Sequence, residues 1–271
     1  MTSTRSNPPD AFKVSTAALS AATLLAIGLL ASNPAAAQSP DAPDAKPVFT
    51  LGLGVVHAPA YEGSDENKTR ALPMLSYRNG RFFAGALGGV GYNFSNSSQL
   101  AFGPVMSYRF GRDESDADRL RGLGDIDGGA DVGGFVRWNL KPFSLHASVK
   151  QGVSGDVKGT QLRVGMGYGM ALSQSDRLMF DASMDWADSE LMQTYYGVNA
   201  TQSANSGLAS YNASSGVRRY GVGAIWSHSF TQQVLSTVSV GVYRLGSEAS
   251  DSPITLKRNV GLVSAGLNYR F

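Results

Sequence analysis

The sequence predicts an all-β fold, an antiparallel transmembrane β-barrel of the outer-membrane kind with about 12 strands. From residue 48 onward, apolar residues alternate with polar or small ones at a period of two, which is the pattern of strands with different surroundings on their two faces. The connections between these segments alternate between short and long. Glycine accounts for 32 of the 271 residues, or about 12%, whereas soluble domains average about 7%. Charged residues account for 16%, whereas soluble domains average about 25%.

The first 37 residues are predicted to be a secretory signal peptide. They combine a basic start, an apolar run from 14 to 30 rich in Ala and Leu, and three small alanines at 35–37. A transmembrane anchor is the alternative, but the apolar run is short for one and is interrupted by Ser and Thr. We therefore expect 38–47 to be a short disordered lead-in and 48–271 to form a single transmembrane barrel domain.

The alternation divides the rest of the chain into twelve segments. In order, we expect strands at 48–57, 70–78, 81–87, 90–94, 99–110, 128–140, 143–153, 159–172, 177–187, 217–229, 233–244 and 258–271. The count of twelve requires a tight hairpin at Gly88-Gly89, and ten strands result if 81–94 is one bent strand. An even number returns both ends of the barrel domain to the same side of the membrane.

The connections separate two ends of the barrel. Short turns fall at Asn79-Gly80, Ser95 to Ser98, Lys141-Pro142, Ser173 to Asp176 and Thr231-Gln232. Longer polar connections fall at 58–69, 111–127, 154–158, 188–216 and 245–257. Because outer-membrane barrels have tight periplasmic turns and extended outer loops, the short turns are predicted to face the periplasm.

A soluble β-sandwich also alternates, so the choice of a membrane barrel depends on what the two faces carry. The apolar faces end in aromatic residues, as expected where lipid meets headgroups: Tyr108, Trp138, Tyr168, Trp186, Trp226 and Tyr269. The opposite faces carry glycine and charges of both signs, which fits a polar lumen.

Several functions are disfavoured by composition. The chain has no cysteine and three histidines, and its formal net charge is +2, so thiolate chemistry, a histidine-rich metal site and nucleic-acid binding are not expected. His146 shares a strand face with Ser144 and Ser148, but residues two apart in a strand do not form a Ser–His hydrogen bond. No catalytic, cofactor-binding or metal site is predicted.

Charged residues on the inner faces are the first candidates for function. They are Arg109, Asp131, Arg137, Lys150, Arg163, Asp181, Asp185 and Arg219, with His146 and Arg270 on the same faces. Buried charges must meet one another or water. Two interpretations stay open: a structural ladder of paired charges, or the lining of a small pore that favours anions because basic residues outnumber acidic ones.

Two further segments have predicted roles. Phe271, with Tyr269 and Leu267 behind it at every second position, has the pattern of a recognition strand for the barrel-assembly machinery. The long connection 188–216 carries Tyr195, Tyr196 and Tyr211 and is expected either to contact a partner or to fold inward and constrict the barrel.

Five short pieces, in order, resemble the MipA/OmpV family of Gram-negative outer-membrane proteins. They are Pro59-Ala60-Tyr61-Glu62-Gly63-Ser64-Asp65, Gly80-Arg81-Phe82-Phe83, Leu123-Gly124-Asp125, Thr194-Tyr195-Tyr196-Gly197-Val198 with Ser206-Gly207-Leu208, and Gly266-Leu267-Asn268-Tyr269-Arg270-Phe271.

The resemblance covers essentially all of the chain after the leader. It implies an outer-membrane barrel and, as for the family's namesake, a noncatalytic scaffold that joins a lytic transglycosylase to a murein synthase. Expected partners are those enzymes, outer-membrane lipids with lipopolysaccharide, and the assembly machinery, with no nucleic acid. Alternatives are a small-solute channel that favours anions, and a surface adhesin or antigen acting through the long loops.

Overall fold

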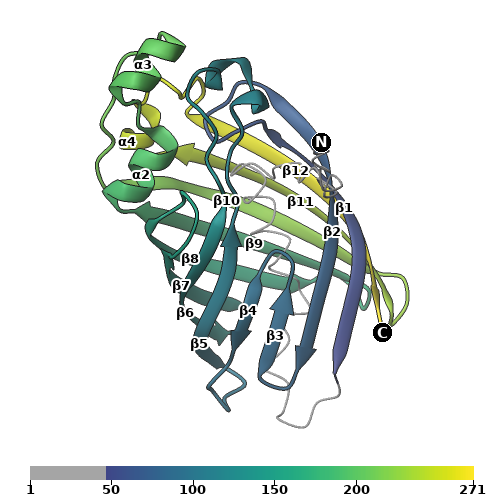
Figure 1. The fold of residues 1–271 in the computed structure, drawn as a ribbon. Coiled ribbons are helices and arrows are strands. Elements are labelled where there is room, and N and C mark those ends of the chain that lie inside the picture. The colour runs from purple at the N-terminus through teal and green to yellow at the C-terminus, as the bar shows by residue number, and fades with distance from the viewer. Residues whose placement is uncertain (1–46) are drawn as a thin grey trace, which may run out of the picture.

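The computed structural model describes residues 47–271 as a closed β-barrel (Figure 1). The predicted signal peptide and all but the last residue of the predicted lead-in at 38–47 lie outside the described residues. Each strand pairs in antiparallel fashion with its neighbours in sequence, and β1 pairs with β12 to close the barrel. The predicted closed antiparallel barrel is confirmed, with twelve strands.

The strands are β1 Val48–Pro59, β2 Asn67–Asn79, β3 Phe82–Gly85, β4 Gly89–Tyr92, β5 Leu100–Arg109, β6 Gly129–Leu140, β7 Phe143–Gly152, β8 Gly159–Ala171, β9 Asp176–Ala187, β10 Gly216–Ser229, β11 Val234–Leu245 and β12 Asn259–Arg270. Most boundaries lie within one or two residues of the predicted ones. The ten-strand alternative is wrong, because Gly89, at a φ of 82°, begins a separate strand β4 that pairs with β3.

The hairpin of β3 and β4 is much shorter than its neighbours, with four residues in each strand. Its strands are also shorter than the predicted 81–87 and 90–94. β3 pairs with β2 only from Ser76 to Asn79. The part of β2 from Asn67 to Met74 is therefore paired with β1 alone. Figure 1 shows this low hairpin at the front of the barrel wall.

The two ends of the barrel differ, as the connections predicted. We call the end with the tight turns the turn end and the other the loop end. The loop end carries five short helices, seen at the top of Figure 1 except where strands cover them: η1 Glu114–Asp116, η2 Asp118–Leu120, α2 Ser189–Tyr196, α3 Ala200–Ser206 and α4 Ser247–Ser250. No helix within residues 47–271 is long and apolar enough to cross a membrane.

The outer wall is apolar. Large side chains at alternate positions are exposed around the barrel, among them Leu53, Met106, Val222 and Val242. Aromatic residues extend this band at both ends: Trp138, Phe143, Tyr168, Trp226 and Tyr269 near the turn end, and Tyr108 and Tyr220 near the loop end. This arrangement matches a lipid-facing band with aromatic girdles.

Candidate functional site

The connection between β9 and β10 folds into the barrel at the loop end. Its helix α2 begins where the Asp188 side chain accepts a hydrogen bond from the Leu191 backbone N–H, at 3.0 Å. Leu191, Met192, Tyr195 and Tyr196 are all buried on this helix. They join a cluster with residues from the adjacent strands β9 to β12, β1 and β2, and with Ile126 and Val157 from the loops after β5 and β7. An apolar core therefore fills the barrel near its loop end.

A second apolar layer lies among the loops. It contains Tyr61, Leu120, Leu123, Val198 and Ile254, with Leu208 and Tyr211 packed against it. The Tyr61 hydroxyl donates to the Ile254 carbonyl at 2.8 Å, and burial raises the pKa of Tyr61 to about 12. The Arg119 guanidinium donates to the Pro253 carbonyl. The loops after β1, β5, β9 and β11 are thus tied to one another instead of extending separately into solvent.

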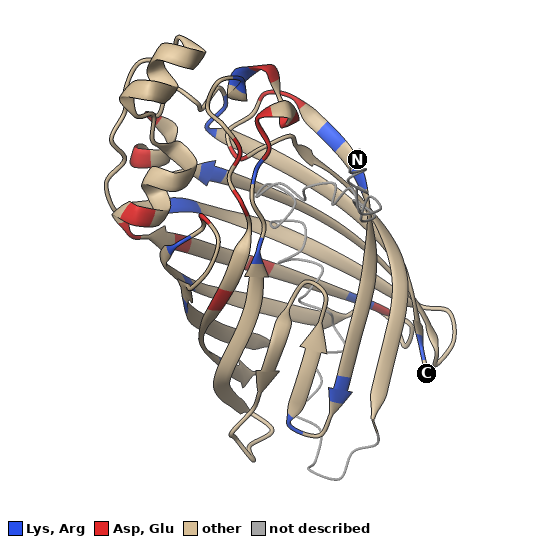
Figure 2. Cartoon of the chain, viewed as in Figure 1, with Lys and Arg blue, Asp and Glu red and all other residues tan. Residues whose placement is uncertain are grey.

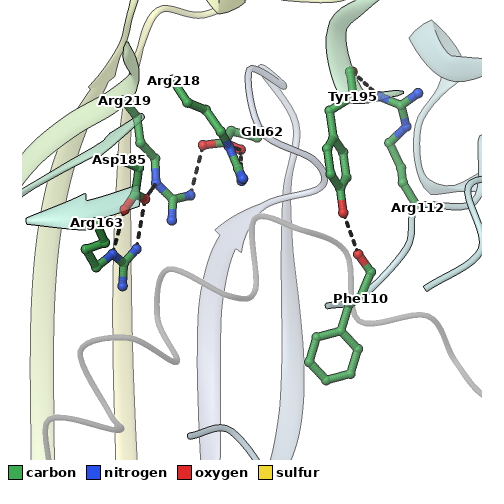
Figure 3. A network of polar contacts seen from close by, with 8 residues as sticks. All are labelled: Glu62, Phe110, Arg112, Arg163, Asp185, Tyr195, Arg218 and Arg219. Carbon is green, nitrogen blue, oxygen red and sulfur yellow. Dashed lines mark hydrogen bonds and ion pairs between the residues drawn. The ribbon is translucent and has the colours of Figure 1, made fainter. Parts of the chain in front are cut away.

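A chain of five charges crosses the barrel beneath these loops (Figure 3). Arg163 grips Asp185 with two hydrogen bonds of 2.6 and 2.8 Å, and Arg219 contacts the same carboxylate at 2.7 Å. Arg219 also donates to Glu62 at 2.8 Å, and Arg218 reaches the other oxygen of Glu62 at 2.9 Å. We call these residues the ion ladder: Arg163, Asp185, Arg219, Glu62 and Arg218.

Four of the five members of the ion ladder are buried. Glu62, Asp185, Arg218 and Arg219 are each at most 5% exposed. Burial alone would raise the pKa of Glu62, but the adjacent charges of Arg218 and Arg219 outweigh it and hold the pKa below the ordinary value. Glu62 is therefore ionised at neutral pH and joins the first loop to the wall.

Two members of the ion ladder, Arg218 and Glu62, were not predicted. Arg218 directly precedes the predicted Arg219, so a regular strand would place one of the two inside and the other outside. A register irregularity between Val217 and Arg219 in the pairing with β9 brings both inward. Glu62 lies in a loop, where no period indicates direction. The only sequence signal for it is its place in the Pro59 to Asp65 segment that carried the resemblance.

The predicted inner-face charges divide into groups. Arg163, Asp185 and Arg219 belong to the ion ladder. Arg109 and Asp131 form a separate buried pair, with a shortest N–O distance of 2.7 Å, and Arg109 also donates to the Val157 carbonyl at 3.3 Å. These two groups have the form of a structural ladder.

The remaining predicted charges line a cavity. Lys150 donates to Ser107 at 2.9 Å, and His146 lies 3.8 Å from Asp181. Arg137 and Arg270 line the same space.

We call the apolar core around α2 at the loop end the plug, and the predicted loop tyrosines point into it. Tyr195 and Tyr196 are 4% and 1% exposed, and Tyr211 is partly buried. The Tyr195 hydroxyl donates to the Phe110 carbonyl at 2.7 Å, while Arg112 donates to the Tyr195 carbonyl at 2.9 Å (Figure 3). Burial raises the pKa of Tyr195 to about 12, so its hydroxyl stays a donor. The tyrosines therefore face the inside of the barrel, and the choice between partner contact and constriction stays a prediction.

Below the plug the barrel encloses a chamber of about 1370 Å³. Its ceiling includes Asp185, Arg219 and Tyr243, and its walls extend down to the turn residues Gly80 and Lys141. The barrel is therefore filled at the loop end and hollow toward the turn end. We call this space the turn-end chamber.

The predicted recognition strand closes the barrel. The Phe271 backbone N–H donates to the Phe49 carbonyl at 2.9 Å, and its ring lies against Phe49 and Tyr269, with centroid distances of 5.6 and 4.7 Å. Leu267, Tyr269 and Phe271 are all exposed on the outer wall. The assembly role of these residues stays a prediction.

A closed antiparallel barrel with an apolar outer band and aromatic girdles defines a transmembrane β-barrel of the outer-membrane class. The chain belongs to the MipA family, whose description is MltA-interacting protein MipA, and the family model matches residues 51–271. The predicted family, fold class and outer-membrane location are confirmed.

Two relatives from Escherichia coli K12 are similar along most of their length. The MltA-interacting protein is 26% identical over 269 residues, covering 92% of this chain and 98% of the relative. The protein described as outer membrane protein YiaT is 26% identical over 231 residues, covering 82% of this chain and 91% of the relative.

Solved barrels resemble the fold more loosely. The NanC porin is 11% identical with a TM-score of 0.43, covering 81% of this chain and 98% of that one. The translocator domain of the autotransporter NalP from Neisseria meningitidis is also 11% identical with a TM-score of 0.43, covering 94% and 100%.

Proposed function

We propose that the protein is a noncatalytic scaffold that holds a lytic transglycosylase and a murein synthase at the periplasmic face of the outer membrane. The observation that carries this proposal is the asymmetry of the barrel, which is filled by loops at one end and hollow at the other. A relative named for its interaction with MltA aligns over 98% of its own length, which supports a similar partner for this protein.

The plug argues against the alternative of a small-solute channel. A solute would have to pass the buried side chains of α2 and the ion ladder, whose members make short, charge-assisted contacts. We expect the refolded protein to give no steady conductance in planar bilayers, with Arg137→Ala and Arg163→Ala as lumen variants. Steady conductance that favours anions and changes in these variants would support a channel instead.

The scaffold proposal is tested by site-specific photocrosslinking in intact cells. A photoreactive amino acid is placed at Asn79, Gln174 or Gln232 in the tight turns, and at Ala204 on α3 at the loop end as the matched control. The turn positions are expected to capture a transglycosylase or a murein synthase, identified by mass spectrometry, and Ala204 to capture neither. Absence of both enzymes at every turn position would overturn the proposal.

The remaining alternative, a surface adhesin, depends on the loop at 188–216. Its exposed part is α3, which has no buried residue. Replacing α3 by a short Gly-Ser linker should leave partner capture at the turns unchanged. Loss of surface adhesion on that change would favour the adhesin.

A further inference from the structure

The turn-end chamber has an unusual balance of charge. Nine basic residues line it, Arg78, Arg81, Arg137, Lys141, Lys150, Arg163, Arg177, Arg219 and Arg270, against two acidic ones, Asp181 and Asp185. Asp185 is engaged by Arg163 and Arg219 at the ceiling. The excess positive charge therefore lies lower, toward the turns. In Figure 2 acidic segments gather among the loops, while basic segments recur at the turn end.

Six of these basic residues form a ring at the mouth of the chamber: Arg78, Arg81, Arg137, Lys141, Arg177 and Arg270. They come from β2, β6, β9 and β12 and from two tight turns, so they surround the opening. Within residues 47–271, Arg78, Arg81, Lys141, Arg177 and Arg270 make no ion pair with a carboxylate. We call these six residues the basic mouth.

The one acidic side chain in the tight turns points away from the mouth. Asp176 accepts hydrogen bonds from Ser173, Trp226 and His228, with the last two at 3.1 and 2.8 Å. Trp226 lies on the lipid-facing side of β10. The Asp176 carboxylate is therefore hydrogen-bonded to side chains on the outer wall and does not neutralise the basic mouth.

Arg78 and Arg137 both line the mouth of the chamber, on strands β2 and β6. A cleft lined by one sign of charge attracts ligands of the opposite sign and raises their local concentration. Guanidinium groups bind carboxylates and phosphates through paired hydrogen bonds.

Aromatic rings lie next to these charges. Phe83 and Phe135 line the chamber and meet edge to face, with ring centroids 5.5 Å apart. Phe83 is the register partner of Arg78, and Phe135 is two residues from Arg137 on the same strand face. Aromatic faces provide apolar contact beside the polar grip of the arginines. The site thus combines anion-binding and apolar surfaces.

The chamber is too large for a simple ion. Its volume of about 1370 Å³ exceeds the range of about 300–1,000 Å³ usual for small-molecule pockets. An occupant that fills it has the size of an oligosaccharide or a peptide, and the ring of arginines requires several negative groups.

We propose that the turn-end chamber binds a soluble murein fragment, a glycopeptide whose stem-peptide carboxylates are held by the basic mouth. The choice of murein among carboxylate-bearing ligands rests on the proposed function, because murein enzymes release such fragments in the periplasm. The anion site itself is argued from the chamber alone. Sugar or alkyl parts of the ligand contact Phe83 and Phe135, and the plug above keeps the ligand from crossing the membrane.

The test is calorimetric titration of the refolded barrel with a purified disaccharide-tetrapeptide. The double variant Arg78→Gln with Arg177→Gln is expected to bind about tenfold to a hundredfold more weakly. Arg244→Gln removes the same kind of charge from an exposed, outward-facing position near the loop end, and should bind like the parent. The double lysine variant, Arg78→Lys with Arg177→Lys, keeps both positive charges. It should therefore bind much more tightly than the double glutamine variant and nearly as tightly as the parent. Gel mobility confirms that each variant is folded.

Chemical controls identify the ligand class. The same fragment with its carboxylates amidated should not bind. Binding of the unmodified fragment should weaken between about 50 and 500 mM salt, because the Debye length falls from about 10 Å near 0.1 M toward about 3 Å at 1 M and the charges are screened. Equal binding to the parent and the double glutamine variant would overturn the proposal. Displacement by equal concentrations of citrate or inorganic phosphate would assign the site to small anions and overturn the glycopeptide.

The outcome is separable from the scaffold. If the turn positions capture murein enzymes but the fragment does not bind, the inference fails and the scaffold stands. If the fragment binds but no enzyme is captured, the chamber site stands and the scaffold fails.

Discussion

Replacing Glu62 with Gln tests whether the ion ladder holds the plug closed. The variant keeps the shape of the side chain but removes the negative charge that faces Arg218 and Arg219, which are 3% and 4% exposed. Breaking a buried ion pair by removing one partner costs about 3–5 kcal/mol. Arg219 keeps its contact with Asp185, so the loss falls mainly on Arg218 and we expect about 3 kcal/mol.

A loss of that size lowers the ratio of closed to open plug by about a hundredfold. We expect protease to cleave the 188–216 loop of the refolded barrel faster by a similar factor, because cleavage follows the population of the open form when reclosing is fast. The matched control is Asp118→Asn, which removes a carboxylate from an exposed pair with Arg121, where both side chains are more than three-quarters exposed. Equal cleavage rates in the Glu62 variant, the control and the parent would refute the role of the ion ladder.

Three further predictions follow from the same structure. Because the pKa of Glu62 is lower in the folded protein than its ordinary value of 4.5, its contribution to stability is complete above that pH and is lost as the pH falls below it; loop cleavage should rise on acidification in the parent but not in the Gln variant. Tyr195→Phe removes the hydroxyl that donates to Phe110 and should cost about 1 kcal/mol by leaving a partly buried carbonyl without this partner, measured by urea unfolding; an unchanged midpoint would show that the contact contributes nothing. Deletion of Phe271, which closes β12 against β1, should slow insertion by the assembly machinery in vitro, whereas Phe230→Ala, an equally exposed aromatic in a tight turn, should not; equal insertion rates would contradict the assembly role.

Sequence alone predicted the barrel because the period of a strand is fixed by its backbone geometry. Once alternation assigned Arg137 and Asp185 to the inner face, their placement followed without knowledge of any partner. The contrast between tight turns and long loops predicted the two unlike ends of the barrel for the same local reason. The short hairpin at Gly89 was predicted as one of two choices, because a glycine pair permits a turn without requiring it.

Tertiary structure decided how the loops fill the lumen. Loops have no period, so nothing local indicates that Glu62 turns inward or that α2 enters the barrel. The Asp188 cap and the Asn199–Gln202 capping box that begin α2 and α3 are sequence signals for helices that a survey of alternation does not detect. Arg218 joins Arg219 inside only because the pairing with β9 slips between Val217 and Arg219.

The basic mouth has the same origin. Its six residues are scattered from Arg78 to Arg270, and closure of the barrel brings them around one opening. In a regular strand, sequence determines which face each side chain takes, because that depends on the local backbone. Which charges meet, and which are left facing a cavity, depends on contacts between distant strands and is decided only when the barrel closes.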